Sequence, residues 1–129
     1  MAIQLRPEAD LLIIELVDRV TLADLLELIT RVQEFEARER RAPDRIVDLS
    51  RCALHLAVGY NDFPAFARAR ERAVPPNRFR SALVAPEPVH YGMVRMYHTV
   101  TNNPLIERAL FRNLRDARAW IGQGEPRNS

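Results

Sequence analysis

The stretch LLIIELVDRVTLADLLELI, residues 11–29, places an apolar strand directly before a capped helix and so decides the class of fold. Its first seven residues are almost continuously apolar, which is typical of a buried strand. Thr21 then offers a side-chain oxygen to the start of a helix, and Asp24, three residues later, completes a pair of the capping-box type. Apolar residues at helical spacing continue to Phe35. The sequence therefore predicts a strand and then a helix that ends near Arg40.

Strands and helices alternate on both sides of this stretch. Ahead of it, residues 2–6 (AIQLR) alternate between apolar and polar, and Pro7 to Ala9 predict a break between two strands. Behind it, Pro43 ends the helix. Buried-type strands are then predicted at 45–49 (RIVDL), 79–85 (FRSALVA) and 105–111, and helices from a cap at Asn61 or Asp62 to the residues before Pro75, from Pro86 to Val100, and from a cap at Asn113 to Ile121. The order β-β-α-β-α-β-α-β-α predicts an α/β fold with a single-layer mixed, largely parallel sheet.

The length of the chain, 129 residues, gives room for one domain. We expect that domain to cover residues 1–121, and residues 122–129 to form a flexible tail. No apolar stretch approaches the roughly 20 residues that cross a bilayer, so no membrane span is expected. Cys52 is the only cysteine, so it has no partner for an internal disulfide, and no basic leader followed by an apolar run opens the sequence. These features predict a cytoplasmic protein.

All nineteen basic residues are arginines, and the formal net charge is only +2. On the first helix an acidic residue stands four positions before an arginine three times, the favourable order for ion pairs on a solvated face. These pairs are Glu27 with Arg31, Glu34 with Arg38, and Glu36 with Arg40.

A second group of arginines lies within residues 68–80, where Glu71 is the only acid. Nucleic-acid sites interleave basic residues with several aromatic ones, and here Phe79 is the only aromatic residue. We interpret the group as a solvated face and expect no nucleic-acid partner. Its members are Arg68, Arg70, Arg72, Arg78 and Arg80.

The residue types that carry catalysis are present without the motifs that activate them. Ser50, Ser81 and Cys52 stand in no nucleophile elbow or phosphate-binding glycine loop. His90 and His98 are eight residues apart, which puts them about 80° apart on a helix at roughly 100° per residue, so they do not form a metal pair. We expect no catalytic site, no metal and no cofactor, and hence no enzyme.

Four short stretches follow one another over most of the chain: TLADLL at 21–26, IVDLS at 46–50, ALVAPEPVHYGMVRMY at 82–97 and LFRNLRDARAWI at 110–121. In this order they resemble bacterial STAS-like, SpoIIAA-like proteins. The resemblance implies a SpoIIAA-like fold in a binding or signalling module, as in anti-sigma-factor antagonists and the cytoplasmic tails of sulfate transporters. The larger CRAL-TRIO lipid carriers look structurally similar.

The phosphorylation site of the antagonists does not carry over to this chain. The resemblance aligns Gly59 with the glycine that opens the next helix, and the antagonists carry Asp-Ser-Ser immediately before it. Here those positions are Leu56, Ala57 and Val58, and none of them accepts a phosphate. The resemblance therefore implies a module without the phosphoserine switch.

Two segments carry the candidate ligand- or partner-binding residues. Tyr91, Arg95 and His98 follow at i, i+4 and i+7 on the helix after the strand at 79–85, where a helix N-terminus beyond a strand's carboxyl end favours an anion. The competing interpretation pairs Arg95 with an acid such as Glu87 and packs Tyr91 at the rim. Tyr60 and Phe63 lie in the irregular stretch 54–66, which opens the helix that regulates binding in the relatives.

Two functions from different classes remain open at this point. The first is a protein-interaction or regulatory module that binds a protein partner or a second copy of itself as a homodimer. The second is a carrier or sensor of a lipid-like or anionic small molecule, held between the sheet and the helices that begin near Gly59 and Pro86. A pocket lined by Met93, Met96, Phe63 and Phe66 would favour the second.

Overall fold

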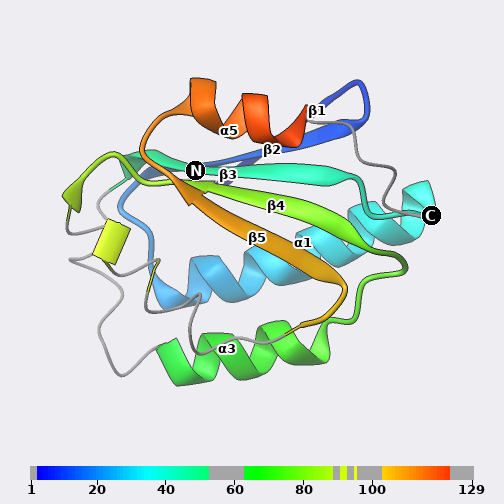
Figure 1. Cartoon of the computed structure of the whole chain (residues 1–129). Coiled ribbons are helices and arrows are strands. Elements are labelled where there is room, and N and C mark those ends of the chain that lie inside the picture. The colour runs from blue at the N-terminus through cyan, green and yellow to red at the C-terminus, as the bar shows by residue number, and fades with distance from the viewer. Residues whose placement is uncertain (1–2, 53–62, 89–90, 93–94, 96–102, 123–129) are drawn as a thin grey trace.

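The computed structural model describes residues 3–52, 63–88, 91–92, 95 and 103–122. It contains one five-stranded sheet with the strands in chain order, β1-β2-β3-β4-β5, as Figure 1 shows. The strands are β1 (Ile3–Glu8), β2 (Leu11–Asp18), β3 (Asp44–Cys52), β4 (Phe79–Val84) and β5 (Ile106–Phe111). The helices are α1 (Leu22–Glu39), α3 (Phe63–Arg72) and α5 (Leu114–Ile121).

The sheet is mixed and largely parallel, as predicted. β1 runs antiparallel to β2 in a hairpin, and the pairs β2 with β3, β3 with β4 and β4 with β5 are all parallel. The predicted break at Pro7 is wrong, because β1 continues through Pro7 to Glu8 and the turn comes after it, with Ala9 at a φ of 53°. Proline is tolerated there because β1 is an edge strand.

The two faces of the sheet are covered unequally. In Figure 1 α1 and α3 lie side by side under one face and α5 lies on the other. Side chains alternate between the two faces along each strand, so Leu12, Ile14 and Leu16 of β2 join the core under α1, while Ile13 packs in the cluster under α5. The parallel strands begin on the side of the molecule where α1 and α3 end.

Local signals set the helix ends as the sequence predicted. Thr21 and Asp24 form the capping box of α1, in which the Thr21 hydroxyl accepts from the Asp24 backbone N–H at 3.1 Å. Asn113 caps α5 by accepting from the Asp116 N–H at 2.8 Å. Of the helix predicted from Pro86 to Val100, the structure describes Pro88, Tyr91, Gly92 and Arg95 as helical, and its other positions lie outside the described residues.

Candidate functional site

A cavity of about 110 Å³ lies between the sheet and the two helices α1 and α3. Most of its wall is apolar, and a smaller part is charged or polar. The apolar residues are Ile14, Leu16, Leu25, Leu28, Ile29, Val32, Val47, Leu49, Phe66, Leu83 and Ile106. The polar residues are Gln33, Glu36, Arg45, Arg70, Ser81 and Arg108.

The polar residues of the sheet form one row across three neighbouring strands. The register pairs Arg45 of β3 with Ser81 of β4, and Ser81 with Arg108 of β5. The next row on the same face, two residues toward the carboxyl ends, is apolar: Val47 pairs with Leu83. The cavity wall therefore changes from polar to apolar along the strands toward their carboxyl ends, while Ile106 of β5 adds one apolar side chain on the other side of the polar row. We call the part of the cavity around the polar row its polar end.

Glu36 of α1 reaches the polar row from the helix side. Its Oε2 accepts a hydrogen bond from Arg45 Nη2 at 3.2 Å, and the side chains are only 9% and 7% exposed. Burial raises the pKa of the Glu36 carboxyl, while the charges of Arg45 and Arg70 act in the opposite direction. The Arg45 guanidinium also lies over the buried ring of Phe79, 4.1 Å from its centroid.

Both helices end near the polar row. Arg70 stands in the last turn of α3 and donates to the backbone oxygen of Ala73 at 3.1 Å, and Glu36 stands in the last turn of α1. A helix C-terminus carries a partial negative charge, which stabilises an arginine and disfavours a glutamate. The position of Arg70 therefore suits the helix, whereas that of Glu36 does not.

Glu36 is the main correction to the sequence interpretation. The sequence predicts that it pairs with Arg40 on the solvated face, but it is buried and pairs with Arg45 of the sheet. A sequence signal for this existed, because Glu36 continues the buried stripe of Leu25, Leu28 and Val32 at steps of three and four.

Of the candidate residues predicted from sequence, Tyr91 and Arg95 have described side chains, and neither is among the residues that line this cavity. Tyr91 is half-buried, packs against the core under α1, and stacks with the Arg112 guanidinium at 4.5 Å from its ring centroid. Arg95 is helical and exposed. Tyr60 and His98 lie outside the described residues, as does the side chain of Phe63. Their proposed roles therefore remain predictions.

Of the four residues predicted to line the pocket of a ligand carrier, Phe66 is the one whose side chain the structure describes. Phe66 lines the cavity from α3. Met93 and Met96 belong to the positions that the structure does not describe. Sequence reasoning missed Arg45 and Arg108, because nothing in the chain order shows that they belong to one row with Ser81.

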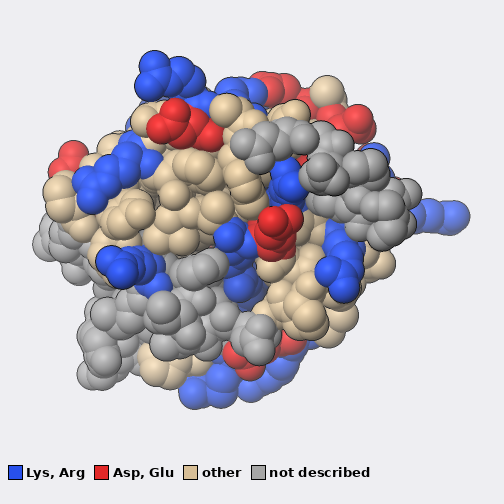
Figure 2. Space-filling view, in the orientation of Figure 1, with Lys and Arg blue, Asp and Glu red and all other residues tan. Residues whose placement is uncertain are grey.

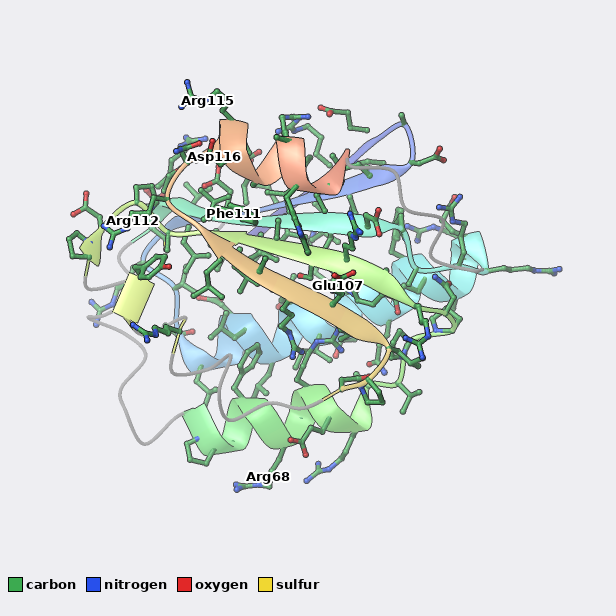
Figure 3. All side chains as sticks on the ribbon, in the orientation of Figure 1. Arg68, Glu107, Phe111, Arg112, Arg115 and Asp116 are labelled. Carbon is green, nitrogen blue, oxygen red and sulfur yellow. The ribbon has the colours of Figure 1, made fainter. Side chains whose placement is uncertain are left out.

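The arginine group of residues 68–80 divides between different surroundings. Arg80 is 7% exposed, and it bonds Glu107 Oε1 at 3.1 Å and the Trp120 backbone oxygen at 3.0 Å on the α5 face. Arg70 lines the cavity. Arg68 is exposed and points away from the sheet in Figure 3. Exposed Arg72 and Arg78 complete the group, so the expectation of one solvated face holds only for part of it.

The surface shows no separation of charge by sign on the face in Figure 2, where acidic and basic side chains are interspersed. No group of three metal-ligating side chains occurs among the residues with described positions. Within the same part of the chain, no helix is long and apolar enough to cross a membrane.

Comparisons with known proteins locate the fold. No family model and no curated protein sequence matches the chain. Among solved structures, an uncharacterised protein of the DUF3478 family with a SpoIIAA-like fold, from Shewanella loihica PV-4, is 15% identical, with a TM-score of 0.61 over 93% of this chain and 92% of that one.

Two structures of SpoIIAA also match. The anti-sigma factor antagonist SpoIIAA in its unphosphorylated form is 12% identical, with a TM-score of 0.57 over 96% of this chain and all of that one. The Bacillus cell fate determinant SpoIIAA in its phosphorylated form is 14% identical, with a TM-score of 0.52 over 93% and 99%. The chain thus has the SpoIIAA-like α/β fold that the sequence resemblance implied.

Proposed function

We propose that this chain is a non-catalytic binding module that takes up a small anionic molecule with an apolar body in the cavity beneath the sheet. The observation that carries this proposal is the amphipathic wall of the cavity. Arg45, Arg70 and Arg108 stand at one end of a space that is otherwise lined mostly by aliphatic side chains. Glu36 is the one acid among the described residues of the wall, so these residues carry a formal excess of two positive charges.

The size of the cavity limits the apolar body. A dry cavity of roughly 150 Å³ in another protein holds a benzene molecule. At about 110 Å³ this cavity fits a body of similar or smaller size, such as a phenyl ring or a short branched chain. A long-chain lipid does not fit within this volume. Of the lipid-like or anionic ligands predicted from the sequence, we therefore propose a small anionic one.

The module is proposed to act through a protein partner or a second copy of itself. One neighbour of the same fold is an anti-sigma factor antagonist, which supports a regulatory role through a protein partner. Val74, just after α3, is 71% exposed and offers an apolar contact point outside the cavity. A cytoplasmic location belongs to the same proposal, and the single cysteine of the sequence, Cys52, which has no second cysteine for an internal disulfide, supports it.

The experiment is a titration of the ¹⁵N-labelled chain with benzoate and isovalerate, followed by NMR. Saturable shifts of amides around the cavity, at Val47, Leu83 and Arg108, are the expected result. Benzyl alcohol is the matched uncharged probe, and it should bind more weakly than benzoate because it lacks the carboxylate. If neither acid gives saturable shifts at the cavity, or if benzyl alcohol binds as tightly as benzoate, the proposal is wrong.

A further inference from the structure

The carboxylate of Glu36 is poorly placed for stability in three respects. It is buried to more than nine-tenths, and the desolvation of a charged pair commonly outweighs its Coulombic attraction. It lies in the last turn of α1, where the helix dipole disfavours a negative charge. Its hydrogen bond with Arg45 joins one carboxylate oxygen to one guanidinium nitrogen, at 3.2 Å, whereas a bidentate pair joins both carboxylate oxygens to the guanidinium.

The same carboxylate occupies the place that an anionic ligand needs. Arg45 belongs to the polar row of the sheet and lines the cavity together with Glu36. An anion at the polar end therefore meets Arg45, Arg70 and Arg108, and it also meets the negative charge of Glu36 at the first of these arginines. The protein supplies its own carboxylate to the site.

We propose that Glu36 is a built-in competitor for the ligand, and that the ligand is a small monocarboxylate which takes over the contact of Glu36 with Arg45. This inference rests on the proposed function of the cavity and adds the ligand's head group and its regulation. Binding is then favoured when Glu36 is protonated and uncharged.

The surroundings of the polar end favour a carboxylate over a phosphate. Phosphate sites commonly use the N-terminus of a helix, where free N–H groups and the positive end of the dipole face the anion. Here α1 and α3 both bring their C-terminal ends to the polar row, so the backbone opposes a second negative charge. The internal group that already occupies the arginine is itself a carboxylate.

Protonation of Glu36 supplies the regulation. Among the described residues, the charged groups that line the cavity with it are Arg45 from β3, Arg70 from α3 and Arg108 from β5, and its uncharged polar neighbours are Gln33 and Ser81. Burial raises the pKa of the Glu36 carboxyl, so Glu36 takes up its proton at a higher pH than a free small carboxylic acid does. As the pH falls, Glu36 is therefore protonated before benzoate is.

The test measures benzoate affinity by calorimetry for the wild type, Glu36→Gln and Glu34→Gln. Glu34 is an exposed glutamate of the same helix, so its variant has the same change in net charge away from the cavity. Glu36→Gln should bind benzoate about tenfold more tightly or better at pH 7.5, and Glu34→Gln should differ less than twofold from the wild type. Wild-type affinity should rise as the pH falls from 7.5 toward the ordinary glutamate pKa of 4.5, and that rise should disappear in Glu36→Gln.

Several outcomes would overturn the inference. Unchanged or weaker binding by Glu36→Gln contradicts competition. A wild-type affinity that is flat from pH 7.5 down to the ordinary glutamate pKa of 4.5 also contradicts it, and that measurement needs no variant to fold. Tighter binding of phenyl phosphate than of benzoate contradicts the head group. In each of these cases benzoate still binds in the cavity, so the proposed function stands and only the competition or the head group is refuted. If neither benzoate nor isovalerate binds in the cavity, the proposed function and this inference are both refuted.

Discussion

A single added methylene can show whether the cavity is an unfilled space in the folded protein. Val47 lines it from β3, and Val47→Ile keeps a β-branched residue in the strand while it extends one side chain into the space. Burying one methylene contributes about 0.8 kcal/mol. The whole cavity sets the upper limit: about 110 Å³ at roughly 24 cal/mol per Å³ gives about 2.6 kcal/mol. We therefore expect Val47→Ile to raise the free energy of unfolding by about 1 kcal/mol.

The matched control is Val84→Ile on the opposite face of the sheet. Val84 is 1% exposed and packs with Ile13 and Ile46 in the cluster under α5, away from the cavity. An extra methylene in a well-packed core costs roughly 1–3 kcal/mol, so this variant should be destabilised. Urea unfolding with linear extrapolation measures both changes. If Val47→Ile is destabilised as Val84→Ile is, or leaves the free energy of unfolding unchanged, the cavity has not been filled and the reasoning from its volume is wrong.

Three further predictions concern elements outside the cavity. Thr21→Ala should lower the free energy of unfolding by about 1 kcal/mol through loss of the α1 cap, whereas Thr30→Ala on the exposed face of α1 should have little effect. The midpoints of urea unfolding of the two variants measure this difference. Asn77→Ala should lower the free energy of unfolding by about 2 kcal/mol in the same assay, because the Asn77 side chain accepts from the N–H of buried Ala42 and donates to its C=O. A variant as stable as the wild type would contradict this. The hydrogen bond from Arg118 holds the pKa of the Glu8 carboxyl below its usual range, so the ionised pair stabilises the fold fully above the ordinary glutamate pKa and ceases to do so as the pH falls through the lowered value. Glu8→Gln should therefore be less stable than the wild type at pH 7 and approach it in acid, and a difference in the free energy of unfolding that does not change with pH would refute the assignment.

The fold was predictable because its signals are local. The run from Leu11 to Val17, the Thr21 cap and the Asn113 cap each depend on neighbours within a few residues, and each appears in the structure where the sequence placed it. The strand ends were less accurate, since hydrogen bonds to a neighbouring strand extend β1 past Pro7 and β3 to Cys52.

The candidate site was not predictable in the same way. Arg45, Ser81 and Arg108 become neighbours only through the register of three strands that are distant in the chain. Local spacing predicts that Glu36 pairs with Arg40, but in the structure it pairs with Arg45. A buried carboxylate is stable only when it is hydrogen-bonded, and here the donor comes from the sheet. The sequence placed a protein-interaction function first and a small-molecule function second, and the amphipathic cavity supports the second.

The row of Arg45, Ser81 and Arg108 has a spacing that the sheet fixes. Neighbouring strands lie about 4.8 Å apart, so the backbone positions of the two arginines, separated by the one strand that carries Ser81, are held roughly 10 Å apart by the hydrogen bonds of the sheet itself. A site made of loops changes its dimensions by insertion or deletion, but this one keeps its span as long as the sheet exists. Within this row, a change of side chain at one of the three positions alters the charge that the sheet presents without altering the spacing.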